Sequence, residues 1–170
     1  MLGRPEPSEA AAYYFTYIDQ VTGDNPNQAI QNQLDESVEF FSSISEDKSL
    51  GRYAPEKWSI RQTLNHVVDT ERLFAFRALW FARGFDAPLP SFDQNTAASA
   101  AVADRVPWAV QIEEFRRVRL ATCSLFEHMP PDAWMRRGLA SGNPFSVRAI
   151  AFIIPGHLAH HVKILRERYL

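Results

Sequence analysis

The sequence predicts an all-α protein, a four-helix bundle preceded by a short extra N-terminal helix. Apolar residues recur at spacings of three and four in four long segments, as they do on the buried face of a helix. Capping residues precede these segments, and glycine or proline ends two of them. No segment alternates apolar and polar residues as a half-buried strand does. With 170 residues, 46% of them hydrophobic, the chain fits one domain, residues 1–170, with its own core.

The first fifty residues predict a short helix and then a long one. Ser8 is a suitable N-cap for a short helix that ends near Val21. After a turn, Asn25 caps the second helix and Pro26 occupies its first position, where a missing N–H costs nothing. The apolar face of this helix consists of Ile30, Leu34, Val38 and Phe41.

The second long helix begins at a capping box formed by residues 59–62 and ends at Gly84, where a left-handed residue is favoured. Its apolar face consists of Ile60, Leu64, Val67, Phe74, Ala78 and Phe81. Residues 85–104 contain Pro88, Pro90 and many polar residues, so they predict a long connection. A connection of that length permits a crossover, and such connections tend to be functional.

The third long helix begins near Pro107, and the prolines at 130–131 end it. Its apolar face consists of Trp108, Ile112, Phe115, Val118, Thr122, Leu125 and Met129. Residues 137–144 are rich in turn formers, and the last helix then runs from Ser146 to the C-terminus. Pro155 lies inside this helix, so we expect a kink just before His157.

Composition excludes several classes of protein. Eighteen Lys and Arg against twenty Asp and Glu give a net charge of −2, and no basic cluster of the kind that binds nucleic acid is present. Cys123 is the only cysteine, so an intrachain disulfide is excluded and a reducing compartment is indicated. Residues 1–7 lack the apolar run of a signal peptide, and the longest apolar stretch, 149–154, is too short to span a membrane. We therefore expect a cytoplasmic protein.

The five histidines all lie beyond residue 65, and three of them predict a metal site. His157 and His161 are four residues apart, so they share one helix face and can bind one ion. His66 lies on another helix, at the edge of its apolar face, and a bundle can bring it across to join them. Imidazole suits zinc, nickel, iron or copper. From spacing alone, core histidines that bond to carbonyl groups explain the pattern equally well.

The other two histidines are weaker candidates. His160 follows His157 by three residues and can reach the same face, but its direction diverges from that of His161. We rank it second as a ligand. His128 lies at a helix end just before two prolines, where a cation interacts favourably with the helix dipole, so we favour a structural role.

Two charged residues of the second long helix are candidates for supporting roles. Glu71 falls on the apolar face, where a carboxylate needs a partner. It either orients a ligating histidine or pairs with an arginine of a neighbouring helix, and we favour the ion pair. Arg77 shares an edge of the helix with His66, so it could receive an anionic substrate, although we favour a surface arginine.

Several motifs, in order along nearly the whole chain, resemble those of the DinB-like (YfiT-like) family. They are YAPEKWSIRQ at 53–62, LNH at 64–66, DTER at 69–72, FARG at 81–84, PLP at 88–90, GHLAHH at 156–161 and LRERYL at 165–170. Tyr13-Tyr14 and Tyr17-Ile18 are also similar to the N-terminal segment of that family. The resemblance implies a four-helix bundle with up-down-down-up connectivity.

The resemblance also implies a divalent metal ion held by His66, His157 and His161, with His160 as the adjacent non-ligand. Zinc or nickel is the first expectation, followed by iron or manganese. Related proteins imply a metal-dependent thiol S-transferase or a hydrolase, acting on a small molecule with a low-molecular-weight thiol as one candidate partner. They also imply a homodimer. The alternative function is a metal-binding or metal-stabilised module without turnover.

Overall fold

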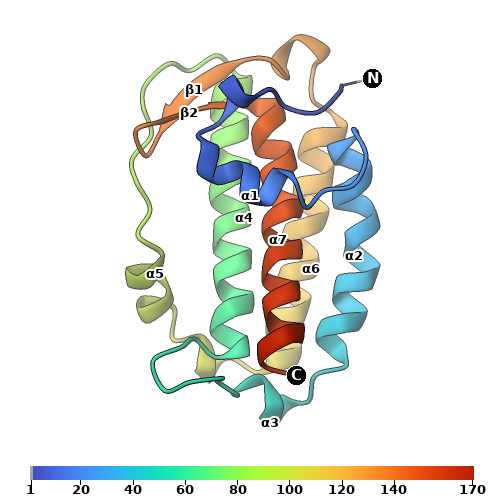
Figure 1. Ribbon diagram of the computed structural model, residues 1–170, viewed down its shortest axis with the longest axis vertical. Coiled ribbons are helices and arrows are strands. Elements are labelled where there is room, and N and C mark those ends of the chain that lie inside the picture. Colours follow the sequence, from blue (N-terminus) through green and yellow to red (C-terminus); the bar gives the residue numbers. More distant parts are fainter. Residues whose placement is uncertain (1) are drawn as a thin grey trace.

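The computed structural model describes residues 2–170, and four long helices dominate it (Figure 1). These helices are α2 (Pro26–Ser42), α4 (Ile60–Ala82), α6 (Trp108–Glu127) and α7 (Val147–Arg168). Helix α4 packs against α6 and α7, and α2 packs against the same two helices. The four predicted long helices are therefore confirmed, and their apolar faces meet between them.

The direction of the helices gives the bundle its connectivity. In Figure 1, α2 and α7 run down the page whereas α4 and α6 run up it. Helices α4 and α6 are consecutive long helices that run in the same direction. A long crossover must therefore return the chain from one end of the bundle to the other. This is the predicted up-down-down-up order, viewed from the other end.

Local side-chain chemistry fixes where these helices begin and end. The side chain of Asn25 accepts a hydrogen bond from the backbone N–H of Gln28 at 3.3 Å. Ser59 and Gln62 form the predicted capping box at the start of α4. Ser146 caps α7 by accepting from the N–H of Ala149 at 2.9 Å. Gly84 follows α4 with φ of +80°, the left-handed conformation expected of it.

A β-hairpin lies between α6 and α7, so the prediction of turns alone for residues 137–144 is wrong. Strands β1 (Arg137–Ala140) and β2 (Asn143–Ser146) pair antiparallel across a two-residue loop. Ser141 and Gly142 in the loop both have positive φ, as a tight hairpin turn requires. At Gly138 an added Cβ would come within 2.0 Å of the Phe81 ring, so only glycine lets the hairpin lie on α4.

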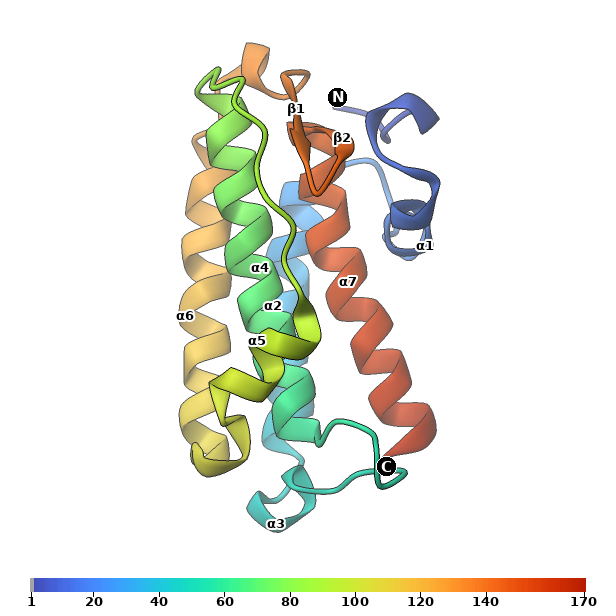
Figure 2. The ribbon, with the colours of Figure 1, turned by 90° about the vertical axis from the view of Figure 1, so that its left-hand side faces the viewer.

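The crossover between α4 and α6 is more ordered than its sequence predicts. It contains α5 (Gln94–Ala101), which Asp93 caps by accepting from the N–H of Thr96 at 2.6 Å. Leu89 pairs with the hairpin, since its N–H donates to the carbonyl of Leu139 at 2.9 Å. Figure 2 shows the crossover running along α4. A second short helix, α3 (Glu46–Ser49), connects α2 to α4.

The N-terminal segment is a series of short turns where one helix ending near Val21 was predicted. It consists of two 3₁₀ turns, Pro7–Glu9 and Ala12–Tyr14, and of α1 (Phe15–Ile18). Helix α1 crosses α7 closely, and a Cβ added at Gly156 would lie 2.1 Å from the carbonyl oxygen of Tyr17. The absence of a side chain at position 156 therefore allows α1 to contact α7.

The core has two parts. One is built around Phe81, Phe126, Phe145 and Phe152 near the hairpin, and the other around Phe41, Leu64, Trp108 and Phe115. Within residues 2–170, none of the helices combines the length and the apolar character needed to cross a bilayer.

Candidate metal centre

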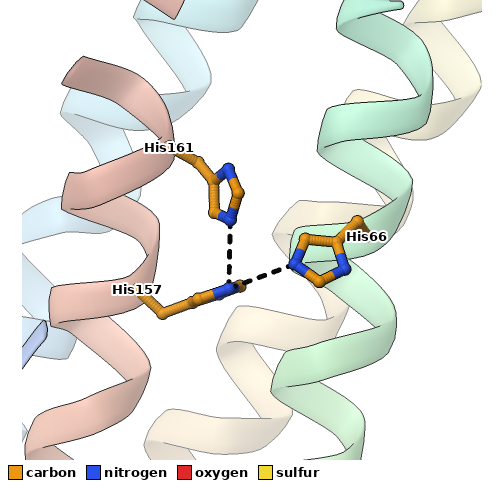
Figure 3. Close-up of side chains that lie close together, drawn as sticks. All are labelled: His66, His157 and His161. Atoms are coloured by element: carbon orange, nitrogen blue, oxygen red, sulfur yellow. Dashed lines mark hydrogen bonds between the residues drawn. The ribbon is translucent and has the colours of Figure 1, made fainter. Parts of the chain in front are cut away.

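Three histidines meet where α4 faces α7 (Figure 3). The Nε2 atoms of His66 and His157 lie 3.2 Å apart, and those of His157 and His161 lie 3.1 Å apart. One ring nitrogen from each residue lies within 4.8 Å of the other two. The structure therefore brings together the three histidines selected from the sequence.

The position of the pair on α7 follows from the helix itself. His157 and His161 are one turn apart, so their rings point to the same side. Helix α7 continues without interruption through Pro155, where a kink was expected. The carbonyl group of Pro155 accepts a hydrogen bond from Gln33 of α2 at 3.0 Å. The helix that contains Pro155 still brings His157 within 3.2 Å of His66.

The three nitrogens fit a bound cation better than they fit one another. His157 Nε2 faces both other Nε2 atoms but carries either one hydrogen or one lone pair, so it cannot form two good hydrogen bonds. A cation satisfies three lone pairs at once. Nitrogens bound tetrahedrally to zinc at ~2.1 Å lie ~3.4 Å from each other, close to the two separations observed here.

Burial keeps these imidazoles neutral, which is the state that binds metal. Burial lowers the pKa of His66 to about 4. The pKa of His161 falls to about 3 through burial and through the proximity of His66 and His160. His157 is the most buried, and burial together with the neighbouring histidines holds its pKa well below the usual value. Protons therefore compete weakly for these nitrogens at neutral pH.

Aromatic and hydroxyl side chains surround the histidines, and sequence analysis did not identify them. Thr70 Oγ1 lies 3.4 Å from Nδ1 of His66, so it can fix the tautomer that presents Nε2. The Trp58 ring packs on His66 with centroids 4.9 Å apart, and the Tyr17 and His157 rings form a T-shaped pair with centroids 5.2 Å apart. Thr70 could have been found, since it follows His66 by one helical turn. Tyr17 comes from distant sequence, and its one signal was the similarity of Tyr17-Ile18 to the N-terminal segment of the DinB-like family, which assigned it no role.

A cavity of about 120 Å³ opens beside the histidines. It is lined by Tyr13, Tyr14, Tyr17, His66, Thr70, Leu73, Phe74, Arg77, Phe92, Gln94, Ser141 and His157. The N-terminal segment, α4, the crossover, the hairpin loop and α7 all contribute to this wall. The segments that the sequence predicts as connections therefore contribute three of the twelve lining residues, namely Phe92, Gln94 and Ser141.

Arg77 lines this cavity, so the favoured interpretation of Arg77 as a surface arginine is wrong. Its side chain is 2% exposed. The Nη2 group donates to the carbonyl of Pro90 at 3.2 Å and to the hydroxyl of Ser141 at 2.9 Å. The crossover and the hairpin cover the side of α4 that helical periodicity assigns to solvent, and this tertiary packing buries the guanidinium.

Glu71 lies in a buried network away from the histidines. Its Oε2 accepts from Arg119 Nη2 at 2.8 Å, and the two side chains are 3% and 0% exposed. Arg119 Nη1 also donates to Gln33 at 3.3 Å, and Gln33 donates to the carbonyl of Pro155. The network connects α4, α6, α2 and α7. No hydrogen bond joins Glu71 to a histidine within residues 2–170, so the geometry is that of an ion pair.

The remaining histidines lie outside the cluster. His160 is half-buried, and its ring forms a T-shaped pair with that of Tyr17, with centroids 5.3 Å apart. Its nitrogens are not among those that converge. His128 is exposed at the C-terminal end of α6, where Nδ1 lies 2.9 Å from the carbonyl of Ser124. Both positions agree with the lower rank given to these residues.

The fold and the site define a class of protein, a four-helix bundle with a crossover and a cluster of three histidines beside a cavity. A family model described as the DinB superfamily matches residues 29–165. The chain belongs to this superfamily. A solved structure, described as "YfiT from Bacillus subtilis is a probable metal-dependent hydrolase with an unusual four-helix bundle topology", is similar with a TM-score of 0.73. It shares 12% sequence identity, and the match covers 96% of this chain and 89% of that one. The comparison with curated proteins found no match.

Proposed function

We propose that this protein is a metal-dependent enzyme that acts on a small molecule through a divalent ion held by His66, His157 and His161. The observation that carries the proposal is the convergence of three neutral imidazole nitrogens beside a cavity whose wall includes His66 and His157. Zinc or nickel suits three nitrogen ligands best, with iron or manganese as further candidates. The description of YfiT as a probable metal-dependent hydrolase supports the same class of activity.

The cavity supplies the features that such a reaction needs. When bound, a divalent ion acts as a Lewis acid and lowers the pKa of a nucleophile. Three protein ligands are the number found at catalytic rather than structural zinc sites. The hydroxyl groups of Tyr13 and Tyr17 lie 2.6 Å apart in the cavity wall. Burial and the neighbouring Tyr13 raise the pKa of Tyr17, so it remains a neutral O–H donor that can orient a substrate oxygen.

Two nucleophiles fit this site. With water the reaction is a hydrolysis, and with a low-molecular-weight thiol it is an S-transfer; both use the same ligands and the same cavity. The non-catalytic alternative is a metal-stabilised module, which needs a fourth protein ligand to close the site. Within residues 2–170, the cluster of possible ligands consists of three histidines and includes no fourth His, Cys, Asp or Glu. This favours an open coordination position on the ion.

The test begins with elemental analysis of the purified chain, followed by turnover of a panel of activated esters and electrophiles with and without added thiol. We expect about one metal ion per chain and a rate that falls on chelation and returns with the metal. His161→Gln should lose both properties, while His128→Gln, at an exposed histidine, should keep them. A metal-loaded protein with no turnover under any condition would leave the binding module as the function.

We also propose that the protein is a cytoplasmic homodimer and that residues 1–170 form one domain. An aromatic patch on the outer end of α4 supports the dimer. It comprises Phe76 and Phe85, 48% and 51% exposed, and Trp80, whose ring stacks on Phe85 at 4.3 Å. Phe76→Glu should shift the light-scattering mass toward the monomer. A monomer mass for the unaltered chain at high concentration would refute the dimer.

A further inference from the structure

Arg77 differs from the other buried arginines. Three arginines within residues 2–170 have buried side chains, namely Arg61, Arg77 and Arg119. Arg61 pairs with Glu46, and Arg119 pairs with Glu71. No carboxylate within residues 2–170 lies at ion-pair distance from Arg77. A buried charge without a partner is costly, so its retention requires an explanation.

The hydrogen bonds of Arg77 use only part of its guanidinium. Nη2 donates to Pro90 and Ser141, whereas Nε is buried and has no partner. The ring of Phe74 lies under the guanidinium at 5.6 Å, which compensates part of the charge. Within residues 2–170, Nη1 forms no hydrogen bond and is not among the buried atoms without a partner, so it can donate to one oxygen of a carboxylate.

The wall around Arg77 favours an anion. None of the twelve residues that line the cavity is acidic, so nothing in this wall opposes a negative ligand. Between Arg77 and the histidines the lining is mainly apolar and aromatic, with Leu73, Phe74 and Tyr14. The cavity therefore presents a cationic end, an apolar middle and a group of neutral imidazoles.

The spacing of the residues sets the size of the ligand. His66, Thr70, Phe74 and Arg77 follow one face of α4, and all four line the cavity. Arg77 is eleven residues from His66, which is about 16 Å along the helix axis. Side chains on a helix lean toward its N-terminus, so the guanidinium reaches back toward His66. A ligand of several bonded atoms can span the remaining distance.

We propose that Arg77 binds the carboxylate of the substrate, and that the substrate is a small elongated organic acid. Its apolar middle packs on Phe74 and Tyr14, and its reactive group lies at His66, His157 and His161. A single cation in a cavity of about 120 Å³ suits a monoanion better than a dianionic phosphate. The position of the reactive group rests on the proposed metal-dependent function, whereas the binding of the carboxylate by Arg77 does not.

The test measures binding of 3-phenylpropanoate and its uncharged amide to the full chain, as purified and after chelator treatment. Calorimetry gives both dissociation constants, and a shift of the ¹⁵N–¹H signal of the Arg77 Nε group reports a change at the guanidinium when the ligand binds. In the chelated protein we expect the acid to bind about tenfold or more tightly than the amide. Because no metal is then present, this preference cannot arise from coordination of the carboxylate by an ion.

Variants separate anion binding from a structural role of Arg77. Arg77→Gln should abolish the preference for the acid, while Arg83→Gln, at an exposed arginine just beyond α4, should leave it intact. Arg77→Lys keeps the charge but loses the Nη1 donors, so it should retain a reduced preference; it also serves if Arg77→Gln does not fold. Equal binding of acid and amide by the unaltered chain, or a full preference in Arg77→Gln, would overturn the proposal. Metal content and turnover of the unaltered chain test the proposed function separately.

Discussion

At the scale of single residues, His157 holds the central position in the site. Its Nε2 atom faces those of both other histidines, and it is the most deeply buried of the three. His161 lies nearer the surface, and His66 is held between Trp58 and Thr70. The three positions are therefore unequal in their surroundings although their ligand atoms are alike.

The first prediction concerns these ligands. His66→Ala, His157→Ala and His161→Ala should each weaken metal binding by more than ~100-fold, because loss of a direct ligand exceeds the usual effect of losing its supporting hydrogen bond. His160→Ala is the matched control, since it lies on the same helix but outside the cluster, and it should retain most of the metal. Metal content after dialysis against a weak chelator provides the measurement. Full retention in His161→Ala would remove that residue from the site.

Sequence reasoning found the three histidines but misjudged Arg77, and the reason is physical. The spacing of His157 and His161 is a local helical property, so the sequence carries it. Whether Arg77 faces water depends on the hairpin loop and the crossover, which fold over α4 from far along the chain. Helical periodicity does not predict which distant segments cover a given face of a helix. The same limit applies to Tyr17, which reaches the site through tertiary contact alone.

At the scale of elements, the four long helices were predictable and the elements that cover them were not. Long amphipathic faces and caps such as Ser59 specify the helices directly. The hairpin has only four residues in each strand, and its pairing depends on the close approach of Gly138 to Phe81. Its one local signal was the Ser141-Gly142 dipeptide, which by itself indicates only a turn.

The contact of α1 with α7 gives the second prediction. Gly156→Ala places a methyl group where the carbonyl oxygen of Tyr17 would lie 2.1 Å away, so α1 must move or the helix must shift. Overpacking of this kind costs about 1–3 kcal/mol. Urea unfolding should show a loss of that size, and metal affinity should fall because Tyr17 and His157 are displaced. Unchanged stability and metal binding would show that α1 moves away without cost.

The N-terminal segment provides a third prediction, on pH. Burial alone would raise the pKa of Glu9, but hydrogen bonds from Arg148, Ser146 and the backbone of Glu6 outweigh this and lower it. A carboxyl group with a lowered pKa in the folded state stabilises the fold above the ordinary value of 4.5. That contribution is lost as the pH falls through the lowered pKa. Protonation of Glu9 should therefore contribute to the loss of folding stability at low pH.

The measurement is urea unfolding between pH 3 and pH 7. Glu9→Gln should be about 3 kcal/mol less stable than the unaltered chain at pH 7, because Arg148 loses its buried partner. The difference should shrink toward low pH, where Glu9 is protonated in both states. Glu39→Gln, at an exposed residue of α2 that forms no ion pair within residues 2–170, should follow the unaltered chain throughout. A Glu9→Gln deficit that is constant with pH would contradict the ionic explanation.

At the scale of the whole molecule, one buried network joins all four long helices. Glu71 on α4 pairs with Arg119 on α6, Arg119 donates to Gln33 on α2, and Gln33 donates to the carbonyl of Pro155 on α7. Pro155 lies two residues before His157. The network therefore couples the packing of the bundle to the placement of the metal ligands.

The last prediction is a double-mutant cycle on this ion pair. Arg119→Met should cost about 3–5 kcal/mol, since it leaves the Glu71 carboxylate buried without a cation. Glu71→Leu should also destabilise, because the guanidinium then keeps only the bond to Gln33. The double variant should lose less stability than the two single variants lose together, because no unpaired charge remains. Urea unfolding measures each term.

The exposed pair of Arg72 and Glu114, between the same two helices, is the matched control, and its cycle should give a coupling of about 1 kcal/mol or less. Metal affinity, measured on the same variants, tests the connection to the site. We expect the metal affinity to fall in both single variants, because each disturbs the contact between Gln33 and Pro155. It should recover partly in the double variant. Strictly additive losses in stability would show that Glu71 and Arg119 act independently, and the network would then not couple the four helices.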